Sequence, residues 1–163
     1  MLEKDLHNGE IAVITGATGG IGTEFGRQLA GKGLDLLLVA RDIRKLEQQK
    51  TQLSIDCHVN VSILCADLSV ISGIESLRDR VVESEKPITF LVNNAGVGLE
   101  GNFISNSAQD YRACLNLNVV GFTDVLHSVV THMLEHGLQS FVINVGSLAG
   151  YHGSPRRAVY SGS

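Results

Sequence analysis

TGATGGIG, residues 15–22, is the stretch of sequence that decides the fold. It follows an apolar run, Ile11–Thr15, and opens a segment in which Ile21, Phe25 and Leu29 recur on one helical face. Glycines permit backbone angles that other residues avoid, let the main chain approach a phosphate closely, and aim helix N-terminal N–H groups at the anion. We therefore predict a strand, a phosphate-binding turn and a helix, with a bare tight turn as the alternative.

Short β-rich runs alternate with segments of helical period along the chain. The runs predict five strands: Ile11–Thr15, Leu34–Ala40, Val59–Cys65, Thr89–Asn93 and Phe141–Val145. Amphipathic patterns predict further helices over Ile43–Leu53, Ile71–Ser84 and Gln109–His136. Apolar strands joined by helices predict a parallel, doubly wound α/β sheet covered on both faces, whose ligands collect at the carboxyl ends of the strands. No domain boundary is visible, so residues 1–163 are expected to form a single domain.

Composition and charge argue against several classes of partner and ligand. The net charge is −4 and no long basic run is present, which argues against a nucleic-acid partner. The three cysteines, Cys57, Cys65 and Cys114, lack C-x-x-C spacing and are expected to be reduced thiols in a cytoplasmic protein. The longest apolar runs are the length of strands, so we expect no membrane partner. His132 and His136 lie four positions apart without a third ligand, so no metal site is expected.

The glycine-rich pattern Thr-Gly-x-x-x-Gly-Ile-Gly resembles the cofactor loop of the short-chain dehydrogenase/reductase family. Asn93-Asn94-Ala95-Gly96, after the fourth predicted strand, is similar to the family's Asn-Asn-Ala-Gly segment. The resemblance implies a Rossmann-like, three-layer α/β/α fold with strand order 3-2-1-4-5 and a bound nicotinamide cofactor. Residues implied to bind it are Gly16, Thr18, Gly19, Gly20, Ile21, Gly22, Asn94, Ala95 and Gly96.

The end of the second predicted strand bears on the choice of cofactor. Arg41 stands where an acidic side chain would select NAD(H), and its planar guanidinium suits a 2′-phosphate. We therefore expect NADP(H) rather than NAD(H), with Arg44 or Lys45 assisting. Two alternatives stay open: Arg41 is a solvated charge, or Asp42 holds a ribose.

Asp67-Leu68, after the third predicted strand, resembles the family pair whose aspartate contacts the adenine amino group. An aspartate here is also suited to cap the helix that is expected near Ile71. Both interpretations stay open at this point.

Three polar residues resemble the family's catalytic groups. Tyr160 follows Ser147 at the family's spacing, and reduction of a carbonyl requires a hydrogen-bond donor and a proton donor at the oxygen. Ser147 would polarise that oxygen, Tyr160 would protonate it, and Asn118 would hold a water of the proton relay. The alternatives are that Ser147 caps a turn, Tyr160 packs on the core, and Asn118 is hydrogen-bonded locally.

The family's catalytic lysine comes four residues after the tyrosine, which is one position beyond Ser163. We therefore expect a truncated member that lacks the C-terminal strands and helices and is inactive or impaired by itself. The parent activity implied is hydride transfer between NADP(H) and a carbonyl or secondary alcohol of a small-molecule substrate, by a homo-oligomer. The alternatives are a non-catalytic nucleotide-binding or interaction module and, less well supported, a flavin- or nucleoside-binding protein.

Overall fold

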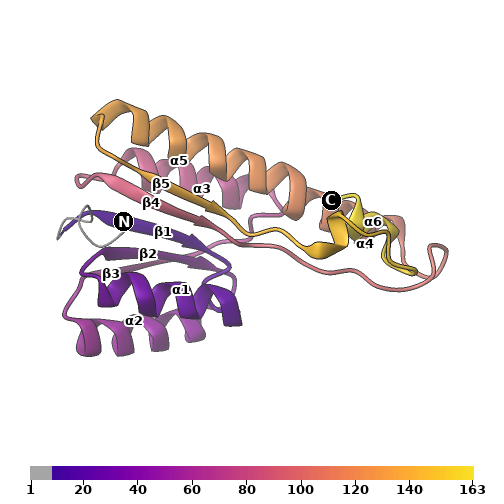
Figure 1. The fold of residues 1–163 in the computed structure, drawn as a ribbon, viewed down its shortest axis with the longest axis horizontal. Helices are drawn as coiled ribbons and strands as arrows, with labels where there is room; N and C mark the ends of the chain where they lie inside the picture. Colours follow the sequence, from indigo (N-terminus) through magenta and orange to yellow (C-terminus); the bar gives the residue numbers. More distant parts are fainter. Residues whose placement is uncertain (1–8) are drawn as a thin grey trace.

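The computed structural model describes residues 9–163 and contains one parallel sheet of five strands in the order β3-β2-β1-β4-β5. This order and the α/β class confirm the fold predicted from the sequence (Figure 1). The strands are β1 (Ile11–Thr15), β2 (Asp35–Ala40), β3 (Val61–Cys65), β4 (Ile88–Asn93) and β5 (Phe141–Asn144).

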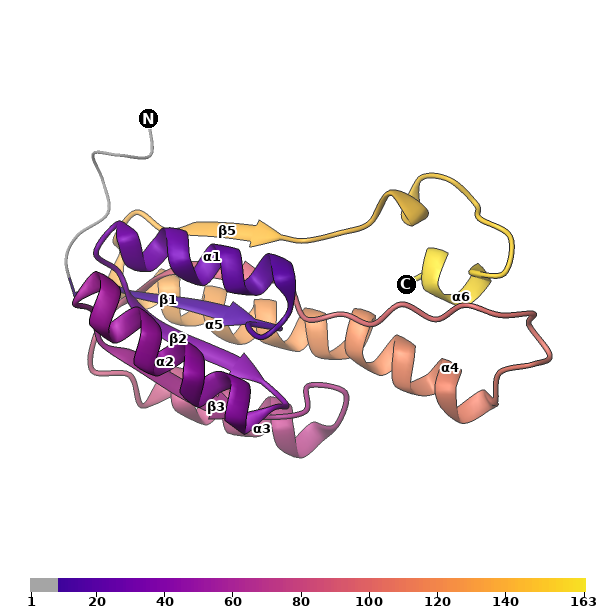
Figure 2. The same ribbon diagram turned by 90° about the horizontal axis from the view of Figure 1, so that it is seen from below.

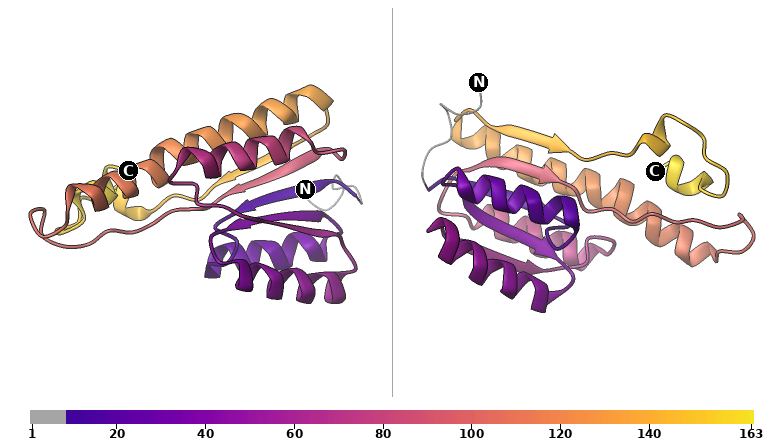
Figure 3. Two further views of the ribbon diagram at one scale, coloured as in Figure 1. Left: turned by 180° about the vertical axis from the view of Figure 1, so that it is seen from behind. Right: turned by 60° about the horizontal axis from the view of Figure 1, so that its bottom comes forward.

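Helices cover both faces of the sheet (Figures 1 and 2). On one face lie α1 (Gly20–Gly31) and α2 (Ile43–Cys57), and on the other lie α3 (Ile71–Val82) and α5 (Phe122–His136), which are in mutual contact in the rear view of Figure 3. Every residue of β2 and β4 is buried, as expected for central strands covered on both sides. Two apolar cores result, one beneath each helical layer.

Four of the five strands differ from the prediction at one of their two limits, by one or two residues. β3 begins at Val61 rather than Val59, because α2 runs to Cys57 and then ends with His58 in the left-handed region at φ 56°. Asn60 is then held outside the strand by hydrogen bonds to Asp35. Such long-range contacts set strand ends and leave no local signal in the sequence.

The helix predicted over Gln109–His136 is present but is not uniform. It consists of α4 (Ala108–Leu115), a π-helical segment η1 (Asn116–Gly121) and α5, which run as one continuous rod. A capping box between Ser107 and Asp110 begins it. Its α4 end extends beyond the sheet together with the two segments that flank it in Figure 2.

The expectation that no segment has the length of a membrane span is wrong for this rod. The stretch Ala108–His136 is long and apolar enough to cross a membrane by length and composition alone. Its inward-facing Val125, Val129 and Met133 are nevertheless buried in the core beside β4. Contact with the sheet accounts for these three residues, although only 28% of the apolar window is buried and Val119, Val120 and Leu134 are exposed.

Candidate functional site

One cleft of about 1310 Å³ opens at the carboxyl ends of the strands. This is where ligands bind in doubly wound sheets. It brings together all but one of the residues predicted for the site: Gly16, Thr18, Gly19, Gly20, Ile21, Arg41, Asp67, Leu68, Asn94, Ala95, Gly96, Asn118, Ser147 and Tyr160. The exception, Gly22, is buried in α1 behind the turn.

Close contacts explain two glycines of the turn. Gly16 has φ 61°, and a Cβ there would lie 2.9 Å from Asn94 Nδ2 and 3.0 Å from Ala95 Cα. A Cβ on Gly22 would overlap the carbonyl oxygen of Gly16. Gly22 therefore lets α1 start directly against the turn, which is a packing role.

The N-terminus of α1 fits an anion. Its N-cap residue is Gly19, which offers no side-chain acceptor, and no carboxylate lies in the first turn. A Cβ on Gly20 would meet no atom within 4 Å, so the space beside the turn is open to the cleft. Main-chain N–H groups at a helix start need acceptors, and the helix dipole favours a negative one. These residues can hold the diphosphate of a dinucleotide.

Buried Thr15, which was not predicted as a site residue, joins the glycine turn to the loop after β4. Its Oγ1 accepts hydrogen bonds from the main-chain N–H groups of Asn94 and Ala95, both at 2.9 Å. Asn94 Nδ2 donates in return to the carbonyl oxygens of Thr15 and Gly16, at 3.0 and 3.2 Å. The signal in the sequence is a hydroxyl residue ending an otherwise apolar strand.

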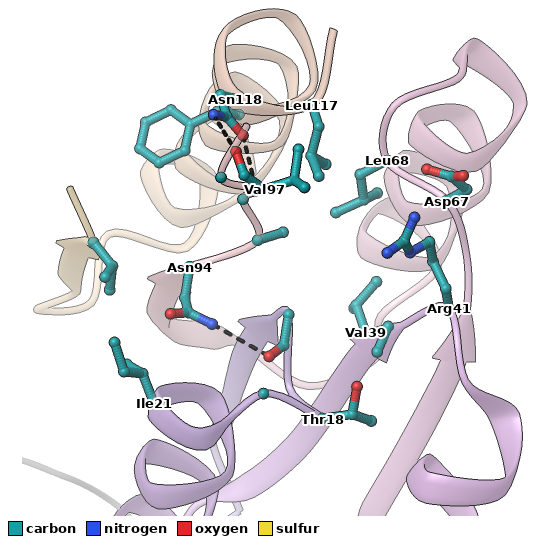
Figure 4. Close-up of a pocket in the computed structure, with 18 of the residues that line it drawn as sticks. Thr18, Ile21, Val39, Arg41, Asp67, Leu68, Asn94, Val97, Leu117 and Asn118 are labelled. Carbon is teal, nitrogen blue, oxygen red and sulfur yellow. Dashed lines mark hydrogen bonds between the residues drawn. The ribbon is translucent and has the colours of Figure 1, made fainter. Parts of the chain in front are cut away.

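The two residues that follow β2, Arg41 and Asp42, have different roles. Asp42 is the N-cap of α2, and its carboxylate accepts hydrogen bonds from the main-chain N–H groups of Arg44 and Lys45. Arg41 is exposed at the cleft, with its guanidinium on the side of Asp67 in Figure 4. Asp42 is thus occupied as a helix cap, whereas Arg41 is available to a ligand.

Asp67 is not the cap of α3, so the helix-cap alternative is wrong. The N-cap residue is Val70, while the Asp67 carboxylate accepts hydrogen bonds from Ser69 N at 2.9 Å and Ser69 Oγ at 2.7 Å. The hydrogen bond from the Ser69 hydroxyl holds the pKa of Asp67 below its ordinary value, and the charge of Arg41 adds to this effect. Asp67 is therefore ionised at neutral pH and faces the cleft as an acceptor.

Asn118 lies in the π-helical segment and is hydrogen-bonded to a distant part of the chain. Its Oδ1 accepts from Val97 N at 2.9 Å, and its Nδ2 donates to Val97 O at 3.0 Å (Figure 4) and to Ser163 Oγ at 2.9 Å. The side chain thus fixes the segment after Gly96 next to the helix. π-helical turns are frequent at functional sites.

Ser147 and Tyr160 both line the cleft from the C-terminal part of the chain. Ser147 also caps the short 3₁₀ helix η2 (Leu148–Gly150), since its Oγ accepts a hydrogen bond from Ala149 N at 3.1 Å. Tyr160 is half-buried in α6 (Ala158–Ser161). Within residues 9–163, no hydrogen bond joins the two hydroxyl groups. The arrangement offers two O–H donors on one cleft wall, one of which also serves as a turn cap.

The two histidines of α5, His132 and His136, are partly buried. His136 Nε2 lies 3.0 Å from the carbonyl oxygen of Ile88, and the His132 ring is edge-on to that of His136 at 5.7 Å. Burial lowers the pKa of His132, and the neighbouring His136 lowers it further. In the described part of the chain, no group of three His, Cys, Asp or Glu side chains is placed to hold a metal ion.

Comparison with known proteins gives concordant matches. Sulfoacetaldehyde reductase 2 of Chromohalobacter salexigens is 30% identical over 155 residues, covering 94% of this chain and 61% of that protein. A short-chain dehydrogenase from Sphingobium yanoikuyae in complex with NADPH superposes with a TM-score of 0.87 at 29% identity, covering 94% of this chain and 59% of that one. NAD⁺-bound xylitol dehydrogenase superposes with a TM-score of 0.85 at 28% identity, covering 95% and 59%.

The chain therefore spans about three fifths of the length of these relatives. The family model described as short chain dehydrogenase matches residues 10–163, which is nearly the whole chain. The strand order and the glycine turn at the carboxyl edge agree with that match. The chain belongs to the short-chain dehydrogenase family of oxidoreductases.

Proposed function

We propose that the protein transfers a hydride between NADP(H) and a carbonyl or secondary alcohol. The cleft supports this proposal because it runs without interruption from the glycine turn, past Arg41 and Asp67, to Ser147 and Tyr160. An extended dinucleotide requires such a path, with its diphosphate at the helix start and its reactive end at the hydroxyl groups.

The placement of Arg41 is the observation that carries the preference for NADP(H). It is the first residue after β2, it is exposed at the cleft, and the neighbouring Asp42 is occupied as the cap of α2. An acidic side chain in this region accepts hydrogen bonds from a ribose 2′-hydroxyl, whereas a guanidinium pairs with a 2′-phosphate. Arg44 and Lys45 also line the cleft and add positive charge.

The proposed roles at the reacting end follow from charge. A bound nicotinamide cofactor supplies or accepts the hydride, and hydride addition places negative charge on the substrate oxygen. The Ser147 hydroxyl would donate a hydrogen bond to that oxygen, and Tyr160 would deliver the proton. Asn118 would keep the adjoining Val97 segment in place through its two hydrogen bonds.

Calorimetric titration of the 163-residue chain with NADPH and with NADH tests the cofactor proposal. We expect tighter binding of NADPH, and loss of this preference in Arg41→Ala. Arg78→Ala is the matched control, because Arg78 is an exposed residue of α3 that does not line the cleft. Binding of neither cofactor, or tighter binding of NADH by the unchanged chain, would contradict the proposal.

A second candidate is a nucleotide-binding module without turnover. It is favoured by the use of Ser147 as a turn cap, without a hydrogen bond to Tyr160 within residues 9–163. Measurement of NADPH oxidation with a panel of aldehydes and ketones separates the two. Oxidation that depends on a carbonyl supports the enzyme and excludes the module.

A further inference from the structure

The turn formed by Asp67 and Leu68 is held between two helix glycines. A Cβ on Gly73 of α3 would overlap the carbonyl oxygen of Asp67 and lie 2.7 Å from its carbonyl carbon. A Cβ on Gly121, the last residue of η1, would overlap the carbonyl oxygen of Leu68 and lie 3.2 Å from its carbonyl carbon. Both helices therefore touch the turn with their main chains.

Lack of room for a side chain, and not an unusual backbone conformation, explains the glycine at position 121. Its φ and ψ are −60° and −40°, which any residue adopts in a helix. Alanine stabilises a helix interior relative to glycine. A glycine in the middle of the rod from Ala108 to His136 is therefore explained by the contact with Leu68.

The segment that carries Gly121 also carries Asn118. Asn118 holds Val97 through hydrogen bonds in both directions, at 2.9 and 3.0 Å. Between these contacts, Leu117 and Leu68 share one apolar core and are 9% and 4% exposed (Figure 4). One π-helical segment is thus in contact with both the Asp67–Leu68 turn and Val97.

We propose that Gly121 is a positioning residue that sets the register between the Asp67–Leu68 turn and Asn118. The close contact of two main chains makes the adenosine-binding part of the cleft and the Asn118–Val97 pair move as one unit. A side chain at position 121 would separate the helix from the turn, displacing both. The identity of the ligand, an adenosine carrying phosphates, rests on the proposed function.

The test compares Gly121→Ala with Gly31→Ala, a control in which the added Cβ at the end of α1 meets no atom within 4 Å. The probes are calorimetric binding of adenosine 2′,5′-bisphosphate and the amide resonance of Val97 without ligand. For Gly121→Ala we expect at least tenfold weaker binding and a displaced Val97 resonance, whereas Gly31→Ala stays within twofold with Val97 unmoved. Where the unchanged chain binds the bisphosphate, a change in only one readout, or in neither, overturns the proposal.

A measurement on the unchanged chain covers the case in which Gly121→Ala does not fold. Titration with adenosine 2′,5′-bisphosphate should displace the amide resonances of Leu68 and Val97 together. If the Leu68 resonance is displaced while the Val97 resonance does not move, the proposed register between the two segments is wrong. If the unchanged chain binds no bisphosphate, the proposed function fails, and the ligand-free Val97 resonance of Gly121→Ala still decides the role of Gly121.

Discussion

Thr15 and Asn94 are hydrogen-bonded in both directions: the Thr15 hydroxyl accepts from Asn94 N at 2.9 Å, and Asn94 Nδ2 donates to Thr15 O at 3.0 Å. Thr15 is fully buried at the end of β1, and Asn94 follows the end of β4. The pair joins the glycine turn to the adjacent loop after β4. Its hydrogen bonds therefore contribute both to folding and to the shape of the cleft.

Replacing Thr15 by valine should lower the free energy of unfolding. The change keeps the volume but leaves the N–H groups of Asn94 and Ala95 without their acceptor, which costs about 1–3 kcal/mol for a buried group. Urea denaturation measures the loss. Thr51→Val is the control, because Thr51 is exposed and its hydroxyl bonds only to Glu47 O in the same helix. Equal stability of the two variants would show that the Thr15 hydroxyl contributes nothing beyond its methyl group.

Replacing Arg41 by glutamate should reverse the preference between the two cofactors. A carboxylate at the end of β2 repels a 2′-phosphate and accepts hydrogen bonds from a ribose 2′-hydroxyl. We expect NADPH affinity to fall by more than about tenfold, roughly 1.4 kcal/mol, while NADH affinity is kept or rises. Calorimetry with both cofactors measures the ratio of dissociation constants. An unchanged ratio would assign the selection to another residue, such as Arg44.

The parallel sheet was predictable from sequence because buried parallel strands are nearly continuous apolar runs, as β2 and β4 show, whereas the strand order was implied by the resemblance to the family. The place of the cleft followed from the rule that ligands bind at the carboxyl edge. The separate roles of neighbouring polar residues such as Arg41 and Asp42 could not be predicted from the sequence. Arg41 and Asp42 are both plausible ligand groups in sequence, and only the start of α2 shows which of them is the helix cap.

The π-helical segment was also beyond prediction from the sequence. Asn116–Gly121 continues the helical pattern without a proline, and the residues it contacts, Leu68 and Val97, are distant in the sequence. Ser147 illustrates the same limit. The sequence allowed a catalytic hydroxyl or a turn cap, and the structure places the residue at the cleft while it caps η2.

Acid should destabilise the protein partly through Asp35, at the edge of the sheet opposite the cleft. Burial alone raises the pKa of Asp35, but hydrogen bonds from Lys86 at 2.6 Å and from Asn60 outweigh burial and lower it. A lowered pKa in the folded state means that the contribution is complete above the unfolded value of about 3.9 and is lost as pH falls through the folded value. The free energy of unfolding should therefore decrease below about pH 4.

Asp35→Asn removes this contribution, so its stability should depend less steeply on pH than that of the unchanged chain between about pH 2 and 5. Urea denaturation across that range provides the comparison. Asp79→Asn is the control, because Asp79 is an exposed residue of α3. An Asp35→Asn variant with an unaltered pH dependence would show that Asp35 titrates alike in the folded and unfolded states.

Two glycines only two positions apart should respond differently to alanine, because one is enclosed and the other is open. The Cβ of Gly22→Ala would overlap the Gly16 carbonyl oxygen, and such overpacking typically costs about 1–3 kcal/mol of stability. The Cβ of Gly20→Ala would meet no protein atom but would occupy the cleft beside the α1 N-terminus. We expect Gly20→Ala to keep its stability and to bind NADPH several-fold more weakly. Thermal unfolding and calorimetry together measure the contrast, and normal NADPH affinity of Gly20→Ala would place the diphosphate elsewhere.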